Sequence, residues 1–392
     1  MATSEFAVYS IAIAMMPWLA LGDIGMGSAL QNFMVESRIA DRNNRPEFNA
    51  VLSLSTIVLC LGLLALILMA PFIGPFLFNS HGMTSAGSTT IFLVASSVFL
   101  ISGIGAISTR ILYGMGNGHL ANALLAFSSI ISFASLIVSV HLLQRDQLVV
   151  AAVLAYALPP AVVNMGALVV LARRYADLKL RIVRSDWVRV SKRSRGFFIA
   201  SFFATAVLNV DYFIMARTLT ATDIAIYAVI SRCLGIFISL YGGMLSASGV
   251  YWLEKWTGND LDSVRRSIFQ HIAAGALATT VLTTLIFIVV FYLKSRAAIP
   301  ILSSLPYSTI FIFGLYTLIR IWNDTFALAM QALNETGILM KVMPLQATVS
   351  IVSQISLSLA FGLNGIILGL IVSFVTTSSW LLPRHFLKIS KV

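Results

Sequence analysis

Six long stretches of this 392-residue chain contain no charged side chain, and they constrain its fold more than any other feature. They cover residues 48–109, 111–144, 147–172, 267–293, 297–319 and 342–383. About 20 consecutive apolar residues cross a bilayer as a helix, so several of these stretches can cross once or twice. Backbone groups in hydrocarbon must form hydrogen bonds within their own segment, which favours helices over open strands. With 58% hydrophobic and only 10% charged residues, the chain is predicted to be an all-α, multi-spanning membrane protein.

Turn-forming and charged residues divide the apolar sequence into about eleven expected transmembrane spans. These spans are 6–34, 49–78, 89–112, 120–143, 148–172, 197–216, 223–250, 268–293, 301–331, 341–362 and 364–383. We expect an N-terminal bundle of five spans over residues 1–172, a basic linker over 173–195 and a C-terminal bundle of six spans over 196–392.

Lysine and arginine are distributed unequally between the two sides of this topology. Twenty of the 26 fall in loops on one side and four on the other. Loops rich in these residues stay in the cytoplasm, which predicts an outer Met1 and a cytoplasmic Val392. The net charge of +11 therefore indicates topology and contact with anionic membrane lipids, not nucleic-acid binding. The linker 173–195 holds nine cations, and it is either a docking segment for anionic lipid or a solvated loop.

An internal repeat relates two parts of the chain. A shift of 218 residues aligns 5–29 with 223–247 without a gap and pairs Tyr9 with Tyr227 and Gly25 with Gly243. Both copies are expected to run inward, giving parallel repeats of the kind found in several transporter folds. The span 197–216 precedes the second copy and has no counterpart before the first. We therefore expect the chain to begin one helix late, through a misassigned start, a truncation or a real loss.

Several segments resemble one known family. They are TSEFAVYS at 3–10, LGDIGMGSAL at 21–30, YGMGNGHLANAL at 113–124 and NVDYFIMARTLTATDIAIYAVISRCLG at 209–235. They are similar to the polysaccharide, or O-antigen, flippases of the multidrug/oligosaccharidyl-lipid/polysaccharide (MOP) exporter superfamily. The resemblance implies two lobes of six helices, here without the first helix. It also implies transfer of undecaprenyl-diphosphate-linked oligosaccharide, an O-antigen or capsule repeat unit, to the outer leaflet of a bacterial inner membrane, with other polysaccharide assembly proteins as further candidate partners.

Five charged side chains within the expected spans are the candidate substrate-binding residues: Asp23, Asp211, Arg232, Arg320 and Asp324. Charges inside a membrane are costly and usually face a cavity or a partner. Our hypothesis is that Arg232 and Arg320 attract the diphosphate, because guanidinium groups match phosphate oxygens. The competing interpretation is that each arginine is held by a carboxylate, with Asp324 four residues after Arg320. For Asp23 the competing interpretation is local capping of a kinked helix.

Five glycines, Gly22, Gly25, Gly27, Gly242 and Gly243, are expected to mark helix kinks and close helix contacts. The tyrosines of the spans are interpreted as packing residues. No cofactor or metal site is implied. Because no nucleotide-binding motif is present, coupling to a proton or sodium gradient, or to downstream consumption, is left open, with Asp23, Asp211 and Asp324 as the carboxylates available for it.

Alternating access of the two bundles is the predicted mechanism. A cation-coupled multidrug exporter of the same superfamily is one alternative, and an inactive truncated remnant is another. A membrane enzyme, such as a polymerase or a lipid-sugar transferase, is disfavoured because the sequence contains no acid-base or nucleophile constellation.

Overall fold

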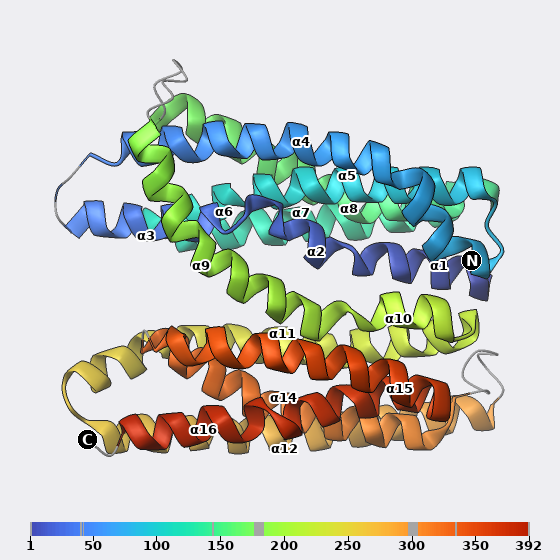
Figure 1. Cartoon of the computed structure of the whole chain (residues 1–392). Coiled ribbons are helices and arrows are strands. Elements are labelled where there is room, and N and C mark those ends of the chain that lie inside the picture. The colour runs from blue at the N-terminus through green and yellow to red at the C-terminus, as the bar shows by residue number, and fades with distance from the viewer. Residues whose placement is uncertain are drawn as a thin grey trace. The chain divides into compact units, whose positions relative to one another are not determined.

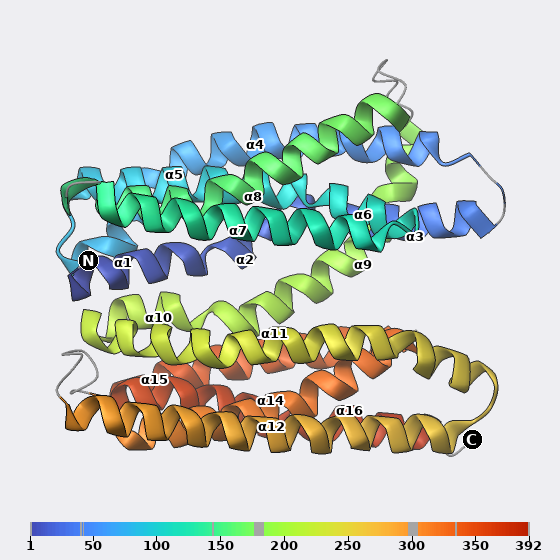
Figure 2. The same ribbon diagram turned by 180° about the vertical axis from the view of Figure 1, so that it is seen from behind.

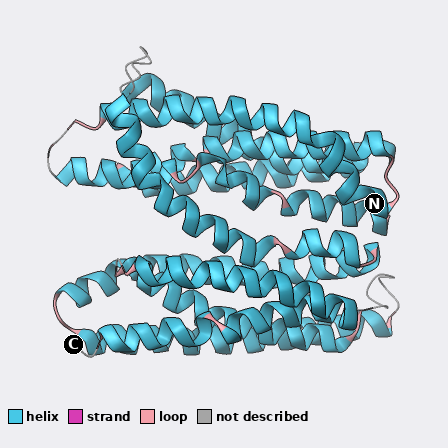
Figure 3. Ribbon diagram, viewed as in Figure 1, coloured by secondary structure: helices cyan, strands magenta, loops and turns pink. Residues whose placement is uncertain are grey.

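A computed structural model describes residues 2–39, 41, 43–142, 145–175, 184–296, 305–333 and 335–390. In this part of the chain all regular structure is helical, as Figure 3 shows. The chain divides into two compact units, Met1–Thr205 and Ala206–Val392 (Figures 1 and 2). Each unit has its own hydrophobic core. The prediction of an all-α membrane protein is confirmed.

Helices in the first unit pack around α5, which contacts α4, α8, α1 and α2. The elements are α1 (Thr3–Ala14), α2 (Met16–Ala20), η1 (Leu21–Asp23), α3 (Met26–Ile39), α4 (Arg45–Phe78), η2 (Asn79–His81), α5 (Ser85–Gly105), α6 (Ile107–Gly114), α7 (Gly118–Leu142), α8 (Arg145–Tyr175) and α9 (Arg184–Asn209). Helix α9 runs across the boundary between the units. It includes residues 184–195 of the expected linker, while residues 176–183 lie outside the described part.

The first expected span is a broken helix. The chain leaves η1 through Ile24 and Gly25, whose φ angles are +47° and +72°, and then enters α3. Asp23 caps the second part, because its carboxylate accepts hydrogen bonds from the backbone N–H groups of Gly25 (2.9 Å) and Gly27 (3.1 Å). The expected kink is therefore confirmed at Gly25.

The second copy of the repeat lies in α11 (Ala221–Thr257), and it starts like the first copy but does not break. Glu5 accepts a hydrogen bond from the backbone N–H of Ala2 (2.6 Å), and Asp223 accepts one from that of Thr220 (3.3 Å). Through Gly242 and Gly243, however, α11 is continuous, and apart from adjacent residues and the nearby backbone of α11 itself, no described atom lies within 4 Å of a Cβ built at either glycine. The expectation of a kink and a close contact was wrong at these two positions.

Three polar contacts fasten the start of α9 to the first unit. The Trp187 indole donates to Ser53 Oγ (2.9 Å), and Arg189 forms an ion pair with Glu47 (2.8 Å). Arg193 donates two hydrogen bonds to the carboxylate of Glu36, at 2.5 and 2.8 Å. The side chain of Glu47 is only 2% exposed, so its charge depends on partners within the protein.

We expect Arg189→Gln to lower the free energy of unfolding of the first unit by about 1–3 kcal/mol, because a buried carboxylate loses a charged partner. The measurement is the unfolding temperature of the purified full chain in detergent. The double variant E47Q/R189Q removes both charges and should recover most of this loss. Equal stability of R189Q and the wild type would show that this ion pair contributes nothing to the fold.

Helix α14 lies at the centre of the second unit, where it contacts α11, α12, α15 and α16. The elements are α10 (Asp211–Thr218), α11, α12 (Leu261–Ser295), α14 (Tyr307–Ala332), α15 (Thr336–Thr376) and α16 (Ser378–Ile389). Within α15 the chain reverses at Gly362, where φ is +54° and ψ is −130°, as the turn sequence predicted. The two arms touch, since Ser353 donates to the carbonyl oxygen of Gly369 (2.8 Å).

Nine described segments are long and apolar enough to cross a membrane. One of them, Gly337–Ile389, contains the reversal at Gly362 and therefore provides two crossings. Helix α14 is not among the nine, and it contains both Arg320 and Asp324. Counted with α14 as a crossing, the spans agree with the expected number of about eleven.

Candidate functional site

The polar site of the second unit contains a buried carboxylate, that of Asp211. Asp211 is the first residue of α10, directly after the break that separates α10 from α9, and it is 3% exposed. The Tyr227 hydroxyl on α11 donates a hydrogen bond to Asp211 Oδ2, and the backbone N–H of Tyr212 donates to Oδ1 (2.9 Å). The rings of Tyr212 and Tyr227 pack edge to face, 5.3 Å apart. These contacts hold the carboxylate between α10 and α11.

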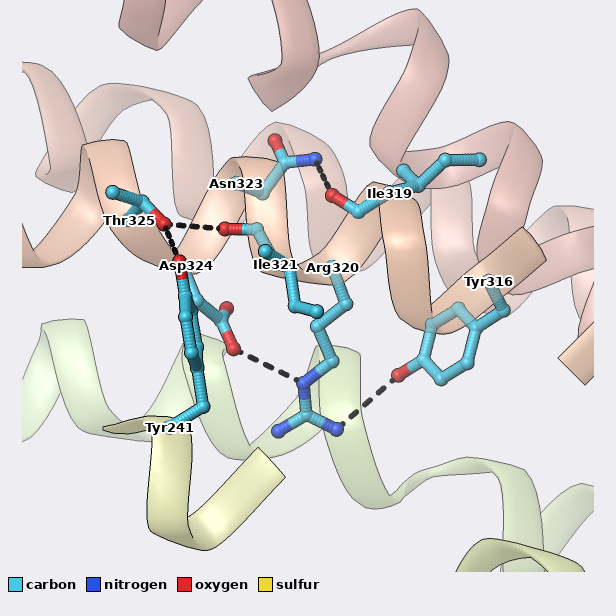
Figure 4. Close-up of polar contacts among 8 residues, drawn as sticks. All are labelled: Tyr241, Tyr316, Ile319, Arg320, Ile321, Asn323, Asp324 and Thr325. Atoms are coloured by element: carbon cyan, nitrogen blue, oxygen red, sulfur yellow. Dashed lines mark hydrogen bonds and ion pairs between the residues drawn. The ribbon is translucent and has the colours of Figure 1, made fainter. Parts of the chain in front are cut away.

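Arg320 lies on the central helix α14, between two partners on the same helix face (Figure 4). Its Nε donates to Asp324 Oδ2 (3.2 Å), and one terminal N–H group faces the Tyr316 hydroxyl at 3.4 Å. The spacing of four residues in each direction places all three side chains along one stripe of the helix. The structure confirms the expected pair between Arg320 and Asp324.

The contacts around Asp211 and those around Arg320 belong to one polar cluster, which we define as Asp211, Tyr227, Tyr316, Arg320 and Asp324. The charge of Arg320 acts on Asp211, and the ring of Tyr227 packs against Phe313 of α14 with the ring centroids 5.0 Å apart. The Arg320 guanidinium thus forms an ion pair with Asp324, and Asp211 lies within the range of its charge. A guanidinium has five N–H donors, and the contacts with Tyr316 and Asp324 use two of them. The other N–H groups of Arg320 can therefore donate hydrogen bonds to a bound anion.

Arg232 lies at the edge of this cluster. It follows Ser231, whose hydroxyl is 3.3 Å from the Tyr212 hydroxyl, and its charge acts on Tyr212. Its side chain is exposed on α11. The structure thus gathers four of the five candidate residues, Asp211, Arg232, Arg320 and Asp324, in the second unit.

The fifth candidate, Asp23, belongs to the first unit. Its carboxylate oxygens accept the backbone N–H groups at the start of α3, and Arg110 on α6 supplies a nearby positive charge. These contacts agree with the interpretation that Asp23 caps a kinked helix. A role for Asp23 in substrate binding stays a prediction.

Sequence reasoning missed the two tyrosines of the cluster, because tyrosines in spans were interpreted as packing residues. Two signals were available. Tyr316 precedes Arg320 by the same four residues that separate Arg320 from Asp324, and Tyr227 is the repeat partner of Tyr9. The neighbouring pair of Tyr241 and Thr325, whose hydroxyl oxygens are 2.8 Å apart, was also missed (Figure 4).

A match to a family profile over the first 250 residues shows the family of the chain. The profile of a family described as polysaccharide biosynthesis protein matches residues 1–250. The chain belongs to this family.

Curated relatives extend this similarity over nearly the whole length. A candidate O-antigen transporter of Salmonella typhi is 29% identical, and the alignment covers 99% of this chain and 89% of the relative. A candidate O-antigen export protein of Yersinia pseudotuberculosis is 26% identical over 98% of this chain and 88% of its own length. Among solved structures, an inward-facing multidrug-resistance MATE transporter of the MOP superfamily has a TM-score of 0.76, covering 100% of this chain and 94% of its own chain. At 14% identity, this likeness shows the shared fold alone. The family match and the O-antigen relatives confirm the resemblance to the polysaccharide family.

Proposed function

We propose that this polysaccharide biosynthesis protein is a flippase. It moves an undecaprenyl-diphosphate-linked oligosaccharide, an O-antigen or capsule repeat unit, from the inner to the outer leaflet of a bacterial inner membrane. The observation that carries this proposal is the similarity to candidate O-antigen transporters over 98–99% of the chain. The proposed topology has a cytoplasmic C-terminus, because the basic loops favour that side.

The polar cluster supports an anionic substrate. Arg320 has guanidinium donors beyond those used by its two partners, and Arg232 is exposed nearby on α11. A guanidinium stays charged inside a membrane and matches the oxygens of a phosphate. We propose that these two arginines attract the diphosphate while the lipid tail stays in the bilayer.

The proposed mechanism is alternating access, with the units Met1–Thr205 and Ala206–Val392 as the moving bodies. Asp211 and Asp324 are the carboxylates of the cluster through which a proton or sodium gradient would act, and Asp23 is a third candidate. The proposal predicts that collapsing both the membrane potential and the pH gradient slows transport. Unchanged transport after this treatment would exclude gradient coupling.

The deciding experiment measures the leaflet location of lipid-linked oligosaccharide in cells that lack their own flippase. Expression of this chain should bring the oligosaccharide to the outer leaflet, whereas the empty vector should leave it inside. A parallel culture without its own multidrug exporters tests the alternative. Raised drug resistance without outer-leaflet oligosaccharide would favour a multidrug exporter, and no change in either assay at normal protein levels would favour an inactive remnant.

A further inference from the structure

The start of α9 carries two structurally different sets of cations. Residues 184–195 contain five of them: Arg184, Arg189, Lys192, Arg193 and Arg195. Arg189 and Arg193 form ion pairs with Glu47 on α4 and Glu36 on α3. The ion pairs of these two arginines therefore hold the start of α9 against α4 and α3.

The other three cations, Arg184, Lys192 and Arg195, are exposed. At 3.6 residues per turn, their spacing places them within an arc of about 80° over a length of about 16 Å. The opposite face of α9 is the packed one, where Val190 and Ser194 are buried. The three cations consequently form one outward stripe, which we call the basic face of α9.

An apolar residue interrupts this basic face. Val188 lies within the same arc by helical spacing and is 59% exposed. Exposed apolar side chains between lysine and arginine are typical of helices that lie where lipid headgroups meet acyl chains. Helix α9 also belongs to a candidate membrane span, Arg184–Thr218, so its basic start is the end of an otherwise apolar segment.

Further cations lie at the same end of the first unit. Arg173 and Arg174 close α8 with exposed side chains, and Arg45 opens α4. Figures 1 and 2 both place the end of α8 and the beginnings of α4 and α9 together. Further cations are thus carried by the elements that meet at the beginning of α9.

We propose that the basic face of α9 binds the phosphate headgroups of anionic phospholipids of the surrounding bilayer. Arg184, Lys192 and Arg195 contact the phosphates, and Val188 reaches the beginning of the acyl chains. Each cation near an anionic surface adds to the attraction, so three on one face give a strong preference for charged over neutral lipid. Arg189 and Arg193 take no part, because their charges are neutralised within the first unit.

The test uses the purified full chain in detergent, titrated with phosphatidylglycerol or with neutral phosphatidylcholine, and native mass spectrometry to count bound lipid. The triple variant R184Q/K192Q/R195Q should weaken phosphatidylglycerol binding by about tenfold or more and leave phosphatidylcholine binding unchanged. Two controls are matched to it. R184K/R195K keeps the charge and should bind like the wild type, and E47Q/R189Q alters the same helix at a neutralised pair and should also bind like the wild type.

Three results would overturn the proposal: undiminished phosphatidylglycerol binding by the triple variant, equal loss of both lipids, or displacement of phosphatidylglycerol by a lower concentration of a long-chain polyprenyl diphosphate. The last result would assign the basic face to a lipid-linked diphosphate instead. The unfolding temperature of each variant verifies its fold. If the triple variant does not fold, the single variants R184Q and R195Q should each weaken phosphatidylglycerol binding several-fold.

Discussion

Gly25→Ala is expected to destabilise the first unit by about 2–4 kcal/mol, because two penalties coincide at this position. The φ angle of +72° is one that residues with a Cβ rarely adopt. An added Cβ would also lie 2.7 Å from the carbonyl oxygen of Ser194 and 2.9 Å from the backbone nitrogen of Phe198. Both atoms belong to the backbone of α9, so the clash cannot be relieved by a side-chain rotation.

Gly243→Ala is the matched control, since Gly243 is the repeat partner of Gly25. Its backbone is helical, and an added Cβ would meet no described atom within 4 Å beyond the adjacent residues and the backbone of α11 itself. Alanine should therefore be neutral or stabilising there by up to about 1 kcal/mol, the usual difference between the two residues inside a helix. Unfolding temperatures of the two purified variants, compared with the wild type, test both expectations. Equal effects of the two substitutions would show that the break after η1 is not a fixed feature of the fold.

This pair of glycines also shows how far the sequence predicts the fold. Uncharged stretches and turn residues are enough to predict the helices and the reversal at Gly362, because both follow from local chemistry. The repeat predicts similar starts for α1 and α11, and both have the same kind of cap. It does not predict that only one copy breaks. The break coincides with close packing of α9 at Gly25, which is a tertiary contact that no local pattern encodes.

The candidate site is predicted less completely. Charged residues in an apolar sequence stand out, so Asp211, Arg320 and Asp324 were found. Tyr227 and Tyr316 were not, because a tyrosine in a membrane helix can pack or donate a hydrogen bond, and only the three-dimensional structure brings its hydroxyl to a charge. The pairing of Glu47 with Arg189 was missed for a similar reason. The two residues are 142 positions apart in the chain.

Arg320→Gln is expected to lower transport at least tenfold and to lower the free energy of unfolding of the second unit by about 1–3 kcal/mol. The loss of stability arises because the partly buried carboxyl group of Asp324 loses its ion-pair partner. The loss of transport has a separate cause under the proposed function, which is the removal of a guanidinium that attracts the diphosphate. Two measurements on the same variant are therefore needed, namely outer-leaflet oligosaccharide in flippase-deficient cells and the unfolding temperature of the purified chain.

The double variant R320Q/D324N tests the first cause, since it removes both members of the ion pair together. Replacing both members of a partly buried ion pair is often neutral for stability, so this variant should unfold near the wild-type temperature. Its transport should stay low if Arg320 attracts the substrate, and the single variant D324N shows how much of the loss comes from the proposed coupling carboxylate. Transport at the wild-type rate would mean that Arg320 serves only to neutralise Asp324. If Arg232→Ala were equally without effect at normal protein levels, the anion-attracting role of both arginines would be excluded.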